Sequence, residues 1–256
     1  MISSDSIKKH IKNEALCVKV YDLIDSTNAE AKRYAAEADL EKFSPVLFVA
    51  REQSAGRGRM GRQFLSRSDC GLYMSLLYFT SGELCGAVKV TTTAASVVAL
   101  AIERVTGKRM RIKWVNDIYN ESGKVCGILA ETLPVRGGYA IVVGIGINIG
   151  DNPFPEELKN IASSVGDLNG EESRLIALIA DGLLSYAENG EDRSYMDAYR
   201  ERFMFTGEMV DLFRADEKIL SGRVIGVDDD GGLLLLPEGV NEAISVRSGE
   251  ISLRRK

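Results

Sequence analysis

The sequence predicts an α+β fold in which irregularly alternating strands and helices are followed by a small C-terminal β domain. The first observation is that strand and helix patterns alternate over residues 1–205. The second is the change after Gly207, where short alternating strands follow one another between glycine-bearing turns. The third is the length of 256 residues with 45% hydrophobic residues, enough for one full core and an appended domain. We therefore expect two domains, 1–205 and 206–256.

The first half of the chain is predicted from caps and periodicity. A strand over 18–24 runs into Asp25-Ser26-Thr27-Asn28, which supplies an N-cap for a helix over 29–38 with Glu30 in its first turn. A long helix of small residues over 86–105 implies tight burial. The remaining strands expected in this half cover 46–50 and 71–79.

The second half is predicted in the same way. The polar, glycine-ended segment 120–123 indicates a turn between strands over 111–115 and 125–133. A strand over 139–149 and amphipathic helices over 171–188 and 192–205 follow. The C-terminal strands are expected at 209–214, 218–227, 232–237 and 242–246.

The segment Gly56-Arg57-Gly58-Arg59-Met60-Gly61-Arg62 sets three arginines among three glycines. Glycine lets backbone N–H groups approach an anion, and guanidinium groups pair with phosphate oxygens in a planar fork. The spelling also matches a dinucleotide-binding fingerprint, which requires a helix directly after the glycines. Because 63–70 is polar and aperiodic and is followed by a strand pattern, we interpret the segment as an arginine loop between strands.

A second polar segment, 111–117, contains Lys113, Asn116 and Asp117, and Lys124 opens the next strand. A lysine between a glycine turn and an apolar strand is costly to bury unless an anion pairs with it, although a solvent-facing strand-edge lysine is the ordinary alternative. With the arginine loop, these residues favour electrostatic catalysis on a phosphate.

Composition excludes several classes of protein. A net charge of −5 argues against general nucleic-acid binding, and no apolar stretch approaches the length of a membrane span. One histidine, His10, nearly excludes a histidine-based triad, and the four cysteines lack the spacing of a zinc site. We expect a cytoplasmic protein whose cysteines are structural thiols: Cys17, Cys70, Cys85 and Cys126.

Several motifs in order resemble those of the biotin–protein ligases, also called biotin–[acetyl-CoA-carboxylase] ligases. Along the chain they are Asp25-Ser26-Thr27-Asn28, Gln53 with the arginine loop, Lys113-Trp114-x-Asn116-Asp117, Lys124-x-x-Gly127-Ile128-Leu129, Gly144-x-Gly146-Ile147-Asn148 and the C-terminal stretch 249–254. The resemblance implies a mixed sheet with flanking helices like that of class II aminoacyl-tRNA synthetases. It also implies an SH3-like β-barrel at the C-terminus.

The resemblance further implies the reaction. Biotin's carboxylate attacks the α-phosphate of ATP, with magnesium, to give biotinyl-5′-AMP, and a lysine of a biotin carboxyl carrier protein then takes the biotinyl group. The implied catalytic residues are Lys124, Arg59 and Asp117, where Asp117 either helps the incoming lysine lose its proton or holds magnesium. The implied biotin-binding residues are Ser26, Thr27, Asn28, Gln53, Gly127 and Ile128. The implied ATP and adenylate-binding residues are Arg57, Gly58, Arg59, Arg62, Lys113, Asn116, Lys124 and Asn148.

The chain departs from the family's usual motifs at two positions. The family usually has proline where this chain has Val115 and tryptophan where it has Phe64, and we expect these changes to adjust the site without loss of activity. Only 24 residues precede Asp25, too few for the DNA-binding module of bifunctional members, so we expect no DNA binding. The resemblance implies a homodimer, because members of the family often join their sheets edge to edge, and a strand such as 140–143 is a candidate edge. The rival functions are a lipoate or octanoate ligase or transferase, and a non-catalytic biotin sensor.

Overall fold

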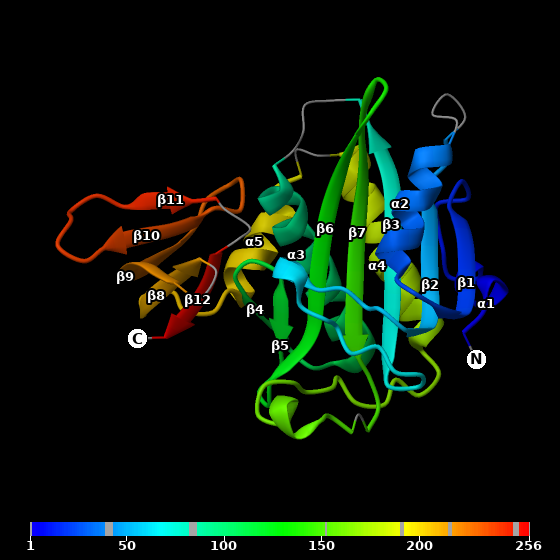
Figure 1. The fold of residues 1–256 in the computed structure, drawn as a ribbon, viewed down its shortest axis with the longest axis horizontal. Coiled ribbons are helices and arrows are strands. Elements are labelled where there is room, and N and C mark those ends of the chain that lie inside the picture. The colour runs from blue at the N-terminus through cyan, green and yellow to red at the C-terminus, as the bar shows by residue number, and fades with distance from the viewer. Residues whose placement is uncertain are drawn as a thin grey trace.

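The computed structural model describes residues 2–38, 43–81, 86–151, 153–189, 192–214, 217–247 and 251–255. Within these residues the chain forms a seven-stranded sheet flanked by helices and a separate five-stranded sheet beside it (Figure 1). This arrangement confirms the α+β class.

The large sheet is mixed, with the strand order β1-β2-β3-β7-β6-β5-β4. Its β1 and β2 are parallel because helix α2 connects them as a crossover, and every other neighbouring pair is antiparallel. The strands are β1 (Cys17–Ile24), β2 (Val46–Gln53), β3 (Gly71–Thr80), β4 (Arg111–Lys113), β5 (Asp117–Tyr119), β6 (Lys124–Val135) and β7 (Gly138–Asn148).

Two expectations about this sheet were wrong. The strand expected over 111–115 ends at Lys113, and the chain turns through 114–116 to pair back as β5, which the sequence pattern did not indicate. The peptide bond between Trp114 and Val115 is cis. The strand segment 140–143, expected as a dimer edge, lies inside β7 and pairs with β3 on one side and β6 on the other. It therefore has no free edge to offer a second subunit.

Helices cover both faces of the large sheet. Helix α2 (Thr27–Glu37) packs Ala31 and Ala35 on Phe48 and Leu77, on the front face in Figure 1. Residues whose side chains point to the opposite face of the sheet, such as Leu76, belong to the core beneath the helices behind the sheet. Those helices are α3 (Ala87–Thr106) and α4 (Glu172–Glu188), joined by α1 (Ser4–Lys8) and α5 (Ser194–Arg202).

The C-terminal sheet is antiparallel with the order β11-β10-β9-β8-β12. Its inner face contributes Leu212, Val224, Leu235 and Leu253, all almost fully buried. Among the described residues the ladder is linear and does not close into a barrel. The strands are β8 (Met209–Arg214), β9 (Glu217–Val227), β10 (Leu233–Pro237), β11 (Ile244–Val246) and β12 (Ile251–Arg255), the last of which was not predicted.

The cysteines of the described residues differ in environment. Cys126 is buried on β6, and burial raises the pKa of its thiol far above the ordinary value, so it is a packing residue. Cys17 is exposed and Cys70 is half-buried, and all three are free thiols. Cys85 lies outside the described residues. In the described part of the chain, no helix combines the length and the apolar character that crossing a membrane would take.

Candidate active site

A cleft opens on the face of the large sheet that carries α2. It lies beyond the N-terminal end of that helix, with the arginine loop on one side and the β4–β5 hairpin on another. Fourteen of the predicted site residues line it: Ser26, Thr27, Asn28, Gln53, Arg57, Gly58, Arg59, Arg62, Lys113, Asn116, Asp117, Lys124, Gly127 and Ile128.

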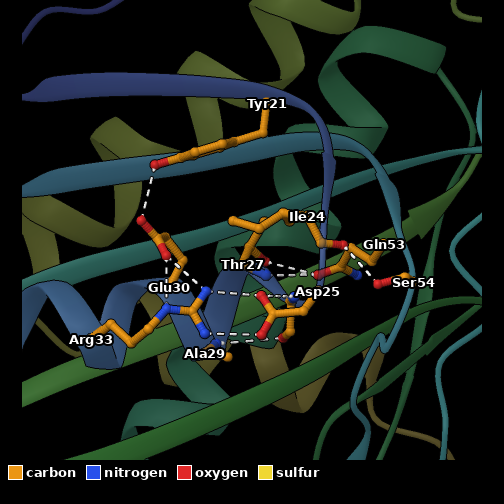
Figure 2. A network of polar contacts seen from close by, with 10 residues as sticks. Tyr21, Ile24, Asp25, Thr27, Ala29, Glu30, Arg33, Gln53 and Ser54 are labelled. Atoms are coloured by element: carbon orange, nitrogen blue, oxygen red, sulfur yellow. Dashed lines mark hydrogen bonds and ion pairs between the residues drawn. The ribbon is translucent and has the colours of Figure 1, made fainter.

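The polar end of the cleft is the start of α2. Ser26 caps the helix by accepting a hydrogen bond from the backbone N–H of Ala29 at 3.5 Å. Gln53 at the end of β2 accepts hydrogen bonds through Oε1 from the backbone N–H of Thr27 at 2.8 Å and from its hydroxyl at 3.2 Å (Figure 2). Buried polar groups at a helix N-terminus are thereby held in fixed positions.

An ion-pair network on the outside supports this helix start. Arg33 forms two hydrogen bonds of 2.9 Å with the carboxylate of Asp25 and also contacts Glu30, which accepts from the Tyr21 hydroxyl (Figure 2). The hydrogen bonds from Arg33 lower the pKa of Asp25 to about 2. The carbonyl of Asp25 accepts from the N–H of Ala55, one residue before the arginine loop. The network therefore ties α2 to the loop.

Glycines form the floor of the cleft. Gly127 on β6 pairs with Gly146 on β7, and the ring of Phe64 stands over both. A methyl group at Gly146 would lie 2.5 Å from Cε1 of Phe64, and one at Gly127 would lie 3.2 Å from the ring and from Nζ of Lys124. A side chain at Gly146 would overlap the ring of Phe64, and one at Gly127 would crowd the ring and Lys124, so both positions favour glycine.

The arginine loop is a short hairpin between β2 and β3, as expected. Gly58 donates its N–H to the carbonyl of Arg62 at 2.7 Å, and Phe64 donates to the carbonyl of Gly56 at 3.0 Å. Arg59 reaches across to the Asn116 side chain, with Nη1 2.6 Å from Oδ1. The loop therefore meets the β4–β5 hairpin over the cleft, while Arg57 and Arg62 stay exposed at its rim.

The β4–β5 hairpin brings the remaining charged groups together. Nζ of Lys124 lies 2.7 Å from Oδ1 of Asp117, and both side chains are about a quarter exposed, at 27% and 23%. Asn116 is held by Ile128, since its side chain donates to the Ile128 carbonyl at 2.9 Å and its carbonyl accepts from the Ile128 N–H at 3.1 Å. Lys124 is therefore paired with a carboxylate at the start of its strand, while its catalytic role stays a prediction.

The cleft carries more positive charge than its own acids balance. Burial lowers the pKa of Arg59 and of Lys113, with the charge of Asp117 opposing both shifts. Among the described lining residues Asp117 is the one acid, against Arg57, Arg59, Arg62, Lys113 and Lys124. Desolvated cations with too few anions mark a site for an anionic ligand.

Asn148 is the predicted site residue that does not line the cleft. Its Nδ2 donates to the carbonyl of Ser163 at 3.0 Å and lies 3.4 Å from the carbonyl of Lys124, so it holds the backbone beside the lysine. Its assignment to ATP binding stays a prediction.

Sequence reasoning missed two residues, one beside the cleft and one in its lining. Ser75 is a fully buried hydroxyl in the middle of β3, and Leu253 of β12 lines the cleft from the C-terminal sheet. A polar residue inside an apolar strand was the available signal for Ser75. Nothing in the sequence placed Leu253 near the cleft. In the described part of the chain, no group of three or more His, Cys, Asp or Glu side chains could hold a metal ion.

The model of the Biotin/lipoate A/B protein ligase family matches residues 20–148, and that of the Biotin protein ligase C terminal domain matches 205–254. The chain belongs to the biotin/lipoate A/B protein ligase family. The resemblance of the sequence motifs is thereby confirmed, and the cleft lies where this family's matched residues meet the C-terminal sheet.

Relatives within the family cover most of the chain. It is 30% identical over 255 residues to the Bifunctional ligase/repressor BirA of Bacillus subtilis, spanning 95% of this chain and 78% of that one. It is 29% identical to the Biotin--[acetyl-CoA-carboxylase] ligase of Paracoccus denitrificans, over 82% of this chain and 90% of that one. Among solved structures, the biotin protein ligase from Aquifex aeolicus in complex with biotin and ATP has a TM-score of 0.77 and 29% identity, covering 94% and 99% of the two chains.

Proposed function

We propose that this protein is a biotin–[acetyl-CoA-carboxylase] ligase: it activates biotin with ATP to biotinyl-5′-AMP and transfers the biotinyl group to a lysine of a biotin carboxyl carrier protein. The observation that carries the proposal is the asymmetry of the cleft. Uncharged hydrogen-bonding groups at the start of α2 occupy one end, and five cations against one acid occupy the other. An uncharged ring system with a carboxylate tail, next to a nucleotide phosphate, fits that asymmetry.

Activation joins two anions, the carboxylate of biotin and the α-phosphate of ATP. A carboxylate oxygen attacks the phosphorus atom, and pyrophosphate leaves. Lys124 and Arg59 reduce the repulsion between the reactants and stabilise the negative charge that builds up on the phosphoryl oxygens. Arg57 and Arg62 at the rim, with the backbone of Gly58, cover the phosphate. Lys113 and Asn116 complete the adenylate side of the cleft.

Transfer requires an uncharged amine on the target lysine. Its nitrogen attacks the carbonyl carbon of the mixed anhydride, AMP leaves, and the nitrogen loses a proton. Asp117 is the acid within the cleft and is our candidate to receive that proton, its carboxylate being oriented by Lys124 at 2.7 Å. The alternative role, holding magnesium, uses the same carboxylate.

Magnesium fits the cleft as a companion of ATP. Mg²⁺ in nucleotide sites is typically held by one or two carboxylates together with substrate phosphates, and Asp117 supplies one carboxylate. The ion would neutralise phosphate charge and favour departure of pyrophosphate. Because the described residues hold no cluster of three metal ligands, we propose that the phosphates provide most of the coordination.

The finer features of the fold belong to the same proposal. We assign residues 1–205 to a catalytic domain like that of class II aminoacyl-tRNA synthetases and 206–256 to an SH3-like domain, because each contains its own sheet. The net charge of −5 supports a ligase that does not bind DNA. We also propose a cytoplasmic homodimer. Strand β1 is its candidate edge, since the outer side of β4 is bridged by Phe203.

Transfer to a carrier tests the function directly. Purified protein, ATP, Mg²⁺ and biotin are incubated with a biotin-accepting carrier domain and with a control domain whose target lysine is replaced by arginine. We expect the mass of the lysine-containing domain alone to rise by one biotinyl group. Replacing biotin by lipoate or octanoate tests the rival ligases. Biotin binding without any adenylate or transfer would establish the sensor function instead.

A further inference from the structure

A charged pair beside the cleft has no part in the chemistry proposed above. Nζ of Lys32 on α2 lies 2.8 Å from Oε1 of Glu131 on β6, and both side chains are partly buried, with 27% and 29% exposed. The other carboxylate oxygen of Glu131 accepts a hydrogen bond of 2.8 Å from Nδ2 of Asn28. The pair thus joins the helix to the sheet and ends on a residue of the cleft.

We propose that Glu131, held by Lys32, is a positioning residue for biotin: it fixes the direction of the hydrogen bonds that run from Asn28 through Ser75 to Thr27, so that Thr27 offers the ligand an acceptor and not a donor. The proposal rests on the proposed function, because it takes Thr27 to face biotin.

The order of donors and acceptors is set first by the carboxylate of Glu131, which can only accept hydrogen bonds. The amide atom of Asn28 that faces Glu131 must therefore be the NH₂ group, and the same group lies 3.3 Å from the carbonyl of Leu129, another acceptor. The amide oxygen consequently points to Ser75, at 2.5 Å from Oγ. Since an amide oxygen cannot donate, the Ser75 hydroxyl is the donor in this contact.

Thr27 is the next residue in this series of hydrogen bonds. The same Ser75 hydroxyl also donates toward Oγ1 of Thr27, 2.7 Å away, so its proton lies between the two acceptor oxygens. The hydroxyl of Thr27 in turn donates to Oε1 of Gln53 at 3.2 Å. The hydroxyl proton of Thr27 is therefore used inside the protein, and lone-pair density alone is left for the cleft.

The orientation of Gln53 is fixed from the other side. Ser66 donates its proton to the carbonyl of Phe64 at 3.0 Å, so its oxygen must accept the hydrogen bond of 2.8 Å from Nε2 of Gln53. Oε1 of Gln53 therefore faces Thr27 and accepts from its backbone N–H. The Gln53 amide cannot flip without leaving two buried groups unpaired.

The absence of a side chain at Gly144 leaves space in the sheet for this series of hydrogen-bonded side chains. Gly144 on β7 lies opposite Ser75 on β3 and Leu129 on β6, and a methyl group at Gly144 would overlap Oδ1 of Asn28. A ligand group that bonds to Thr27 must then bring a hydrogen-bond donor. The cyclic urea of biotin brings its N–H groups, whereas the dithiolane ring of lipoate has no donor. The device therefore favours biotin over lipoate.

The test is the dissociation constant for biotin, measured by calorimetry on the full chain. Glu131→Met removes the acceptor, Ser75→Ala removes the relay, and Glu131→Gln keeps an acceptor oxygen as the conservative rescue. Glu37→Met, an exposed acid on the same helix, is the matched control. We expect Glu131→Met and Ser75→Ala to raise the Kd about tenfold, as expected for loss of an oriented buried hydrogen bond, with the other two within about threefold. The KM for ATP should stay within about threefold throughout.

The Kd for biotin and the KM for ATP also define the results that would overturn the positioning role. Biotin binding within twofold of the unmodified protein in both Glu131→Met and Ser75→Ala would overturn the positioning role, and Ser75→Ala decides alone if Glu131→Met does not fold. An equal rise in the KM for ATP would show a general structural effect and overturn it as well. If the unmodified protein binds no biotin, the proposed function falls together with the positioning role. If the unmodified protein binds biotin and the variants bind it equally well, the positioning role is overturned and the proposed function stands.

Discussion

Nζ of Lys124, at the start of β6, and Oδ1 of Asp117, at the start of β5, lie 2.7 Å apart inside the cleft. The two residues are seven positions apart in the sequence, and the β5–β6 hairpin brings them onto the same side of the sheet. Their pairing keeps a cation and a carboxylate in one place, and our proposal assigns the cation to activation and the carboxylate to transfer.

Replacing Lys124 by alanine should therefore separate binding from chemistry. We expect the rate of biotin-dependent pyrophosphate release to fall about 100- to 1000-fold, the size usual for loss of one oriented charge in a transition state. Biotin should still bind, because the hydrogen-bonding groups of α2 are untouched. Lys9→Ala, at an exposed lysine after α1, is the control. Turnover within threefold of the unmodified protein would remove Lys124 from its assigned role.

The glycine floor predicts a steric effect that a second substitution should relieve. Gly146→Ala would place a methyl group 2.5 Å from the ring of Phe64 and push the ring into the cleft. We expect the KM for biotin to rise about tenfold, a typical cost of overpacking. Gly86→Ala is the matched control, since nothing lies within 4 Å of its added methyl group. Adding Phe64→Leu to Gly146→Ala should restore part of the affinity, and no recovery would contradict this account of the floor.

A hydrogen bond joins the two sheets beside the active site. Nε1 of Trp114, in the turn between Lys113 and Asn116, donates to the carbonyl of Gly231 at 2.9 Å. Trp114→Phe keeps an aromatic ring in place of the indole but leaves that carbonyl unpaired, and we expect the free energy of unfolding to fall by at least about 1–2 kcal/mol. Chemical denaturation measures it.

The control for that prediction lies in the same neighbourhood. Tyr199→Phe removes a longer hydrogen bond, 3.4 Å from the hydroxyl to the Val115 carbonyl, and should cost less. If Trp114→Phe is as stable as the unmodified protein, or less costly than Tyr199→Phe, the bond to Gly231 does not hold the sheets together.

The pair Asp25–Arg33 predicts an acid-dependent contribution to stability. Hydrogen bonds from Arg33 lower the pKa of Asp25 from 3.8 to about 2, so the stabilisation is complete above about pH 4 and is lost as the pH falls toward 2. Both side chains are about half exposed, and solvent screening reduces the contribution to about 1 kcal/mol. Asp25→Asn should be less stable by this amount at pH 7, and the difference should vanish near pH 2. Equal stability at both pH values would show that the pair contributes nothing.

The parts of the fold that sequence predicted are those with local signals. The cap at Ser26, the glycine-ended turn before Lys124 and the alternating strands of the C-terminal sheet all follow from residue chemistry within a few positions. The turn through 114–116 was missed because Trp-Val-Asn contains neither glycine nor proline and reads as a continuing strand.

The missed site residues depend on contacts that are distant in sequence. Ser75 meets Asn28 across 47 positions, and Glu131 meets Asn28 across 103, so no local pattern could pair them. The reason for glycine at 144 and 146 was equally hidden, because it lies in the side chains of Asn28 and Phe64. Fourteen of the residues assigned from the motif resemblance line one cleft of the structure, but the resemblance did not show which contacts hold them there.

The most direct test of the central claim is mass-spectrometric detection of the acyl-adenylate formed by the purified protein with ATP and Mg²⁺, offered biotin and lipoate in parallel. We predict biotinyl-5′-AMP with stoichiometric pyrophosphate, and no lipoyl-AMP above background. Lipoyl-AMP as the main product, or no adenylate with either acid, would contradict the assignment of the cleft to biotin activation.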